Sequence, residues 1–410
     1  MTNVKTLEIV RVGAQGDGIA ETAAGPVYVP FTLAGEQVTA EVEGERGRLL
    51  SVETSSPDRV APVCRHFGIC GGCAAQHMAR EKYLSWKHES VVAAFRARGI
   101  DAQIVPVVSA KGKRRRAALS ARKTQGGVFV GFHQAGTHDL VTIEECPVLE
   151  AQIVGALPAI KALVAPLLSR RGEVRIAVTS SPGGLDINLE DAGKTLSREL
   201  RIHLAREAQL AGFARISIDG DVAFESSKPF QRFGPADAVP PPGSFLQAVA
   251  DAERQMVAHI LEAVGKVKSV ADLFSGVGAF TFPLAENFRV LACDSDREAI
   301  AALQFAVKNT QGLKPVQGLV RDLFREPLSG LELNDYDAIV FDPPRAGAEA
   351  QAQKIAKSKV KTVVGVSCNP ATLARDARVL IDGGYKLESV TPIDQFLYSP
   401  HIEAVAVFRR

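Results

Sequence analysis

The sequence contains no long apolar run. No window of its 410 residues approaches the roughly 20 consecutive apolar residues of a membrane-spanning helix. The first residues, MTNVKTLEIVRVGAQGDG, have no apolar signal region and predict a strand followed by a turn. These absences argue against a membrane protein, and we expect a cytoplasmic one with no membrane partner.

Net charge is also scarce. The 48 Lys and Arg against 46 Asp and Glu leave only +2, so the whole-chain charge does not indicate a nucleic-acid partner. We find no internal repeat and no low-complexity tract. At one domain per roughly 150 residues, the length predicts two or three domains. An apolar fraction of 46% and a charged fraction of 23% describe an ordinary soluble protein with an ample core.

Cysteine is rare, and its six positions are Cys64, Cys70, Cys73, Cys146, Cys293 and Cys368. The first three follow a C-x5-C-x2-C spacing, which in a cytosolic protein indicates a metal site rather than disulfides. An iron–sulfur cluster takes four thiolates, and Cys146 is the remaining candidate outside the last domain. The alternative is zinc held by three cysteines and His66 or His77. Because zinc ribbons commonly use C-x2-C pairs, we favour an iron–sulfur cluster, used structurally or to position RNA.

Three regions differ in pattern. Residues 1–58 alternate short apolar runs with glycine-rich turns, which predicts a small β-barrel that binds oligonucleotides or serves as a docking module. Residues 59–240 form a β-rich central domain with the cysteine cluster, and a helix predicted at 79–100 can pack on the last domain. After DAVPPPGSF, residues 241–410 alternate strands and helices, which predicts an α/β domain with a doubly wound, mainly parallel sheet.

A glycine loop opens the last domain. In ADLFSGVGAFTFPLA, Gly276 and Gly278 follow a predicted strand and begin a helix, where a ligand can approach the backbone. Asp294 ends the next strand, where a carboxylate can bind ribose hydroxyls. A dinucleotide fingerprint requires a third glycine, and Thr281 stands there, so S-adenosylmethionine fits better than NAD. The alternative is a tight turn that binds no ligand.

Cys368 lies in VGVSCNPATLARD, after a predicted strand, where α/β enzymes place reactive groups. A thiolate that adds to C6 of uracil makes C5 nucleophilic, so a methyl group can be attached there by covalent catalysis. The C5 proton must then leave, which requires a general base. Glu403 heads the apolar strand in SPHIEAVAVF and can reach the same pocket. The alternatives are a buried structural thiol and a surface carboxylate.

Two further motifs carry charge. In DAIVFDPPRAG, two prolines hold Asp342 rigidly at the end of another strand. The densest positive stretch, SAKGKRRRAALSARK, suits phosphate contacts, although a solvated face explains it as well. The residues that we predict to contact RNA there are Lys113, Arg114, Arg115, Arg116 and Arg122.

Taken together, these segments resemble the RNA uracil-5 methyltransferases, more specifically the 23S ribosomal RNA branch with an iron–sulfur cluster. The resemblance spans nearly the whole chain and is carried by SCNPATLARD, HIE, DPPRAG and C-x5-C-x2-C. It implies a Rossmann-like class I methyltransferase domain, an N-terminal TRAM domain and a central domain with a [4Fe-4S] cluster. It also implies S-adenosylmethionine as cofactor, RNA as partner and a monomer. The barrel and the cluster favour ribosomal RNA over tRNA.

The resemblance also implies roles for single residues. Cys368 matches the nucleophile and Glu403 the base, while Asp342 lies where cofactor and target uracil meet. The further cofactor positions are Gln247, Phe274, Asp294 and Asp322. The segment RRRAALS matches the family's RNA-facing central domain.

Three positions depart from the family pattern. Val249 replaces a frequent Asn, which removes one cofactor hydrogen bond, and Ser275 and Ala279 alter the glycine loop. These changes affect cofactor affinity rather than the reaction class. The alternatives are the same chemistry on tRNA and a non-catalytic iron–sulfur protein that binds RNA.

Overall fold

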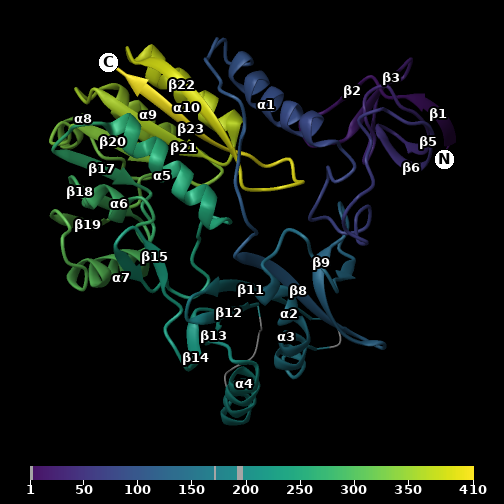
Figure 1. The fold of residues 1–410 in the computed structure, drawn as a ribbon, viewed down its shortest axis with the longest axis horizontal. Coiled ribbons are helices and arrows are strands. Elements are labelled where there is room, and N and C mark those ends of the chain that lie inside the picture. The colour runs from purple at the N-terminus through teal and green to yellow at the C-terminus, as the bar shows by residue number, and fades with distance from the viewer. Residues whose placement is uncertain (1–2, 170–171, 192–196) are drawn as a thin grey trace.

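The computed structural model describes residues 3–169, 172–191 and 197–410 and divides them among four sheets (Figure 1). The N-terminal sheet has the order β1-β5-β6-β4-β3-β2 and buries Leu7, Val27, Val38 and Ala40 on one face. Burial alternates along its strands because successive side chains point to opposite faces. Its strands are β1 (Asn3–Glu8), β2 (Arg11–Val12), β3 (Gly18–Thr22), β4 (Gly25–Val29), β5 (Gln37–Glu43) and β6 (Arg46–Thr54). The likeness of this sheet to a TRAM domain stays a prediction.

Helix α1 (Arg80–Arg96) contacts two parts of the molecule. Near its start, the Trp86 indole N–H donates to the carbonyl oxygen of Gly13 in the N-terminal sheet region, at 2.9 Å. Near its end, Val91 and Phe95 are buried in the core of the C-terminal sheet, and the helix packs beside α10 (Pro370–Asp382). The helix therefore belongs partly to the C-terminal core, although it precedes that core by about 150 residues.

The central sheet has seven strands in the order β10-β9-β8-β11-β12-β13-β14. Its buried face packs against helices α3 and α4, and the core includes Leu119, Ile176, Ile187 and Leu204. The strands are β8 (Arg116–Thr124), β9 (Gly127–His133), β10 (Leu140–Thr142), β11 (Glu173–Ser181), β12 (Gly184–Glu190), β13 (Arg215–Ile218) and β14 (Asp221–Glu225). The helices are α2 (Ala151–Gly155), α3 (Leu157–Val164) and α4 (Arg198–Ala211). A separate hairpin joins β15 (Gln231–Phe233) and β16 (Ala236–Ala238).

The C-terminal sheet has eight strands in the order β19-β18-β17-β20-β21-β23-β22-β7. Its strands are β7 (Val108–Ser109), β17 (Ser269–Leu273), β18 (Arg289–Asp294), β19 (Val316–Val320), β20 (Ala338–Phe341), β21 (Thr362–Ser367), β22 (Lys386–Asp394) and β23 (Glu403–Arg409). The strands from β19 to β21 are parallel, as predicted, whereas β23 runs antiparallel to both of its neighbours. Strand β7 comes from the region expected to be central, yet it pairs with β22.

Helices cover this sheet, as expected for an alternating pattern (Figure 1). They are α5 (Ala250–Val264), α6 (Thr281–Ala285), α7 (Arg297–Lys308), α8 (Gly330–Leu333), α9 (Glu349–Ala356) and α10. Helix α6 is shorter than the predicted segment because its preceding residues form turns. No helix in the described part of the chain is both long and apolar enough to cross a bilayer.

The topology brings the ends of several strands together at one edge of the C-terminal sheet. The carboxyl ends of β17, β18, β20 and β21 meet there because these strands are parallel. Strand β23 is antiparallel, so its first residue, Glu403, lies at the same edge. The reversal therefore brings a fifth strand end to the place where ligands bind in open α/β sheets.

Candidate active site

A cavity of about 430 Å³ opens at this edge of the C-terminal sheet. Its volume lies in the range of about 300–1,000 Å³ that is typical of small-molecule sites. The predicted residues that line it are Gln247, Phe274, Gly276, Asp294, Asp342, Cys368 and Glu403. The structure thus brings together side chains that lie more than 150 residues apart in the sequence.

Asp294 is held in place by backbone donors. The N–H of Gly276 donates to Asp294 Oδ2 and the N–H of Asp296 donates to Oδ1, both at 2.9 Å. Gly276 has a φ of 52°, a left-handed conformation that favours glycine, and a Cβ there would meet no atom within 4 Å. The loop therefore needs glycine at position 276 for its backbone, and it presents an oriented carboxylate to the cavity.

Gly278 has a packing role. It is not among the residues that line the cavity, and a Cβ there would lie 2.8 Å from Phe282 and 3.0 Å from Leu303. This glycine allows α6 and α7 to pack closely, and a close ligand approach at Gly278 stays a prediction.

Phe324 was missed by the sequence analysis. It is 46% exposed, lines the cavity, and its ring centroid lies 5.5 Å from that of Phe274. Asp322 lies outside the cavity lining, and its Oδ1 accepts the backbone N–H of Phe324 at 2.9 Å. In the structure Asp322 therefore acts on the cavity through Phe324, because it fixes the turn that carries this ring. No sequence pattern marked Phe324, since a single aromatic residue after a strand is not distinctive.

Two buried carboxyl groups face the thiol in the deepest part of the cavity. Burial, reinforced by the charge of Glu403, raises the pKa of Asp342 well above its usual value. Burial also raises the pKa of Glu403 to about 7. The Cys368 thiol has a pKa raised to about 12 by burial and by both carboxylates, while Arg345 acts in the opposite direction. In the resting site, burial therefore favours the uncharged, protonated forms of both carboxyl groups, and the neighbouring thiol is also protonated.

Amide side chains link the two carboxyl groups. Gln247 Nε2 donates to Asp342 Oδ2 at 3.0 Å. Gln395, which the sequence analysis did not identify, donates from Nε2 to Gln247 Oε1 at 2.7 Å and to Glu403 Oε1 at 2.9 Å. The second oxygen of Glu403, Oε2, is buried and has no hydrogen-bond partner among the described residues. Gln395 thus holds Oε1 of Glu403 by a hydrogen bond, while Oε2 has no hydrogen-bond partner among the described residues.

Val249 departs from the family pattern without leaving a gap in the cavity wall. Its side chain is 4% exposed and packs in the core between α5 and the sheet, and it does not line the cavity. Its backbone N–H donates to Gln395 Oε1 at 3.2 Å. Ala279, by contrast, does line the cavity.

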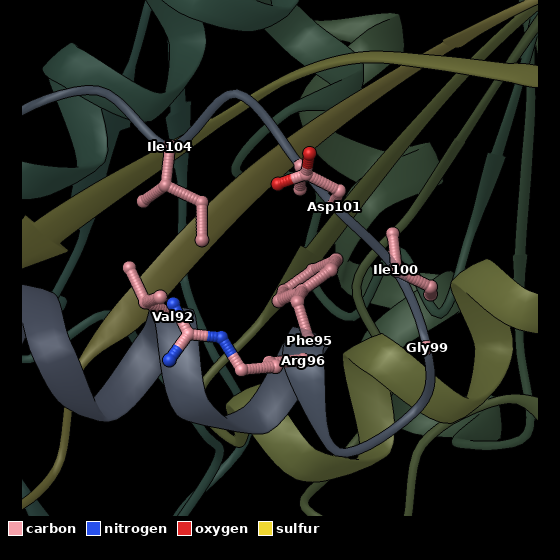
Figure 2. A pocket seen from close by; sticks show the side chains of 8 residues that line it. Val92, Phe95, Arg96, Gly99, Ile100, Asp101 and Ile104 are labelled. Carbon is pink, nitrogen blue, oxygen red and sulfur yellow. The ribbon is translucent and has the colours of Figure 1, made fainter.

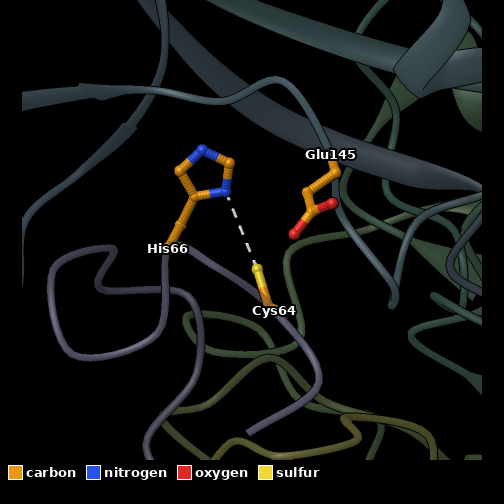
Figure 3. Close-up of side chains that lie close together, drawn as sticks. All are labelled: Cys64, His66 and Glu145. Carbon is orange, nitrogen blue, oxygen red and sulfur yellow. Dashed lines mark hydrogen bonds between the residues drawn. The ribbon is translucent and has the colours of Figure 1, made fainter.

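Four cysteines line a second, smaller cavity of about 50 Å³, and they are Cys64, Cys70, Cys73 and Cys146. Figure 3 shows that His66 and Glu145 point toward Cys64. The Cys64 Sγ lies 3.7 Å from His66 Nδ1, and the three ligand atoms lie within 4.8 Å of one another. His77 does not line this cavity, and its ring packs 5.6 Å from that of Phe67. Of the two histidines considered for zinc, only His66 is therefore near the thiols.

The basic run does not form one exposed face. Lys113 is exposed, and Arg122 is partly exposed and paired with Glu173 at 2.6 Å. The predicted RNA contact of Arg115 is wrong, because its guanidinium is buried and ion-paired with Glu253 at 2.5 Å. Burial of this kind removes the side chain from any phosphate.

Arg114 and Arg116 occupy different places again. The Arg114 guanidinium lines the cysteine cavity and lies over the Phe396 ring, 5.5 Å from its centroid. The Arg116 guanidinium lies 4.9 Å from the ring centroid of Phe245, which is 66% exposed at the mouth of the active-site cavity. Arg116 therefore stands beside the mouth of the candidate active site.

Another cavity, of about 250 Å³, lies between the end of α1 and residues 99–104 (Figure 2). Val92, Phe95 and Ile104 contribute apolar side chains to its wall, and Arg96 and Asp101 stand on opposite sides of it. None of the residues predicted to act in chemistry lines it.

Comparison with known proteins finds a matching family and relatives that share the length of this chain. The family model described as tRNA (uracil-5-)-methyltransferase matches residues 240–410. A protein of Agrobacterium fabrum named as an RNA methyltransferase is 46% identical over the full length of both chains. The 23S rRNA (uracil(1939)-C(5))-methyltransferase RlmD of Yersinia enterocolitica is 32% identical over 96% of this chain and 92% of that protein.

A solved structure shares the whole architecture. The tRNA (uracil-54, C5)-methyltransferase of Pyrococcus abyssi, in complex with S-adenosyl-L-homocysteine, superposes with a TM-score of 0.76. The match covers 98% of this chain and 99% of that chain at 24% identity, and it shows a common fold.

Proposed function

This chain belongs to the RNA uracil-5 methyltransferase family, and we propose that it methylates C5 of a uridine in 23S ribosomal RNA through a covalent bond between Cys368 and C6. The observation that carries the mechanism is the meeting of Cys368, Asp342 and Glu403 in one buried cavity. The likeness to RlmD, over nearly the full length of both proteins, supports ribosomal RNA as substrate.

The cavity fits S-adenosylmethionine. Its volume is adequate, the oriented carboxylate of Asp294 suits ribose hydroxyls, and the exposed ring of Phe324 suits an adenine face. When bound, S-adenosylmethionine supplies an electrophilic methyl group. Gln247 and Asp342 line the same cavity as the glycine loop and Cys368, so in this proposal they contact both cofactor and uracil.

Cys368 acts first, as the nucleophile. Its thiolate forms a bond to C6 of the uracil, and the C5–C6 π pair moves toward C5 and the O4 carbonyl. The carbon nucleophile at C5 then takes the methyl group, and the pair of the broken carbon–sulfur bond stays on the departing sulfur. Before this addition the thiol loses its proton to solvent, and the charge of Arg345 favours that loss because it acts to lower the pKa of Cys368.

Glu403 completes the reaction as the general base. Its free Oε2 removes the C5 proton, the C5–H pair restores the C5–C6 double bond, and the C6–sulfur bond breaks to release the thiolate. A pKa of about 7 suits this role, because such a carboxylate is substantially ionised at neutral pH and still binds a proton well.

We also propose that the four cysteines of the smaller cavity hold an iron–sulfur cluster. The donor set suits it, since four thiols from two separate segments line one cavity. Cys64, His66 and Glu145 form a tighter group, and zinc at that group is the competing assignment. Metal analysis of anaerobically purified protein distinguishes them, because a cluster predicts about four irons per chain.

RNA reaches the cavity across its exposed mouth in this proposal. Phe245 offers an exposed ring on which a base can stack, and the guanidinium of Arg116 lies over the same ring. The exposed Lys113 adds a nearby charge for phosphate. The second candidate substrate is tRNA, favoured by the description of the family model.

The test uses methyl-labelled S-adenosylmethionine with unmodified 23S and tRNA transcripts in separate reactions. Nucleoside digestion and mass spectrometry then detect 5-methyluridine. Label in the 23S transcript alone supports the proposal, whereas label in tRNA alone keeps the chemistry and overturns the substrate. No 5-methyluridine in either RNA overturns both.

A further inference from the structure

Gln395 is a buried amide that contacts two other segments of the chain, residues 247–249 and Glu403. It follows β22 directly and is 1% exposed. Its side chain bonds to Gln247, to Glu403 and to the backbone of Val249. A glutamine buried so deeply needs its polar atoms satisfied, and here the two bonds donated by its NH₂ group reach residues that line the candidate active site.

The network fixes the orientation of both amides. The Val249 N–H can only donate, so the atom of Gln395 that faces it is the carbonyl oxygen. The Gln395 NH₂ group must then face Gln247 Oε1 and Glu403 Oε1, and both of its hydrogens are used. Gln247 in turn directs its own NH₂ group at Asp342. Reversing either amide would place an oxygen against another acceptor.

We propose that Gln395 is a positioning residue that assigns the two oxygens of Glu403 to different tasks. It holds Oε1, and Oε2 is left as the oxygen that removes the C5 proton. Through Gln247 the same amide fixes the position of Asp342. The inference rests on the proposed function, since it concerns the proton-removal step of that reaction.

A neutral donor suits this place better than a cation. A lysine or arginine bonded to Glu403 would neutralise the base and weaken its affinity for a proton. An amide orients the carboxylate and favours its ionised form only moderately. The charged groups around Glu403 are Asp342, Cys368 and, beyond the thiol, Arg345.

The backbone next to Gln395 is itself anchored. The preceding residue, Asp394, forms a buried ion pair with Lys87 of α1 at 3.0 Å and accepts from the Tyr83 hydroxyl at 2.7 Å. Lys87 also donates to the carbonyl oxygen of His401, two residues before Glu403. Helix α1 thus fixes both ends of the loop between Gln395 and Glu403, so the amide stands on a rigid support.

The test compares Gln395→Met with a matched control, Gln351→Met. Gln351 is also fully buried, but it bonds only to the backbone N–H and carbonyl of Leu328, away from the cavity. For Gln395→Met we expect kcat to fall about 100-fold, the cost typical of a misplaced reacting group. Because the thiol still adds first, the methylated protein–RNA adduct should accumulate on denaturing gels. The pH at which kcat reaches half its maximum should move upward.

The Gln351→Met protein should keep the pH profile of the parent and form no lasting adduct. The variant Gln395→Glu keeps the side-chain shape, and it provides the same test if the methionine of Gln395→Met packs poorly. It should also accumulate adduct, because a third carboxylate repels Glu403 at neutral pH. If both Gln395 variants retain the parent pH profile and release product without an adduct, the positioning role is wrong. Failure of the parent protein to make 5-methyluridine would instead overturn the proposed function.

Discussion

Glu403 stands in the active site with one oxygen bound and the other unpartnered, in an environment that raises its pKa. Two roles are consistent with a buried carboxyl group: a structural acceptor for Gln395, or a base that takes a proton from substrate. The free oxygen separates them, because a purely structural acid would leave a buried polar atom without a partner at a cost of about 1–3 kcal/mol.

Replacing Glu403 with Gln should trap the enzyme on its RNA. Cys368 can still add to C6 and the methyl group can still be transferred, but removal of the C5 proton should slow by about 10²–10⁴-fold. Denaturing electrophoresis with labelled RNA measures the trapped complex. The double variant with Cys368→Ala should form none, and Cys293→Ala, which changes a buried thiol outside the cavity, should behave like the parent. Rapid product release by Glu403→Gln would remove Glu403 from the base role.

Stability and activity should respond to pH in opposite directions. Burial raises the pKa of Glu403 from 4.5 to about 7, so between these values the folded chain keeps a proton that the unfolded chain has lost. Folding therefore loses stability from this group as the pH rises through that window. Over the same window the ionised base becomes available and turnover increases. Thermal melting between pH 5 and pH 8 should show a smaller loss of stability for Glu403→Gln than for the parent, and equal slopes would contradict the assignment.

At the scale of elements, the sequence pattern predicted the strands that carry the site. The segments SVADLF, RVLACD, DAIVFD and TVVGVS are strands in the structure, because continuous β-branched and apolar runs are typical of a sheet buried on both faces. Pattern alone could not show that β23 runs antiparallel, since direction depends on the connection from β22 and not on local residues. The same limit hid Gln395, which lies in that connection.

The central region illustrates a second limit. Charge clustering predicted an exposed basic strip, yet alternation along the start of β8 turns neighbouring arginines in different directions. Arg115 is buried against α5, while Arg116 reaches the cavity mouth. A sequence shows which cations are close along the chain, and only the packing of the sheet shows which of them meet solvent.

The cysteine cavity draws on two elements far apart in sequence, and this supplies a test at the element scale. Cys146 precedes α2, whereas the other three thiols lie between the N-terminal sheet and α1. Cys146→Ser should remove most of the iron and the broad visible absorption of a cluster, although it leaves the C-x5-C-x2-C motif intact. Retention of about one zinc per chain by this variant would favour the competing site at Cys64 and His66.

At the scale of the whole molecule, the central and C-terminal sheets are joined by buried polar contacts. Arg115 pairs with Glu253 and also donates to the carbonyl oxygen of Gln247 at 3.0 Å. Lys113, two residues earlier in the chain, is exposed. Neighbouring cations therefore differ in their surroundings, since Arg115 joins the two sheets and Lys113 meets solvent.

Variants of these two cations should separate stability from RNA affinity. Arg115→Ala leaves Glu253 buried without its partner and should lower the free energy of unfolding by about 3–5 kcal/mol. Lys113→Ala should leave stability unchanged, raise KM for RNA and reduce the dependence of binding on salt. Denaturant titration and binding assays at two salt concentrations check both results. A stable Arg115→Ala protein with weakened RNA binding would reverse the assignment.

The placement of α1 and β7 has a consequence for how such a protein can be inherited. Both precede the central sheet in the chain, yet α1 packs on α10 and β7 completes the edge of the C-terminal sheet. A gene exchange with a single crossover near codon 240 would deliver a C-terminal half whose edge strand β7 and partner helix α1 both come from a foreign parent. Recombination that preserves the fold must therefore transfer two separate stretches of the gene together. We therefore expect the C-terminal sheet to be inherited together with α1 and β7 from the amino-terminal region of the same gene.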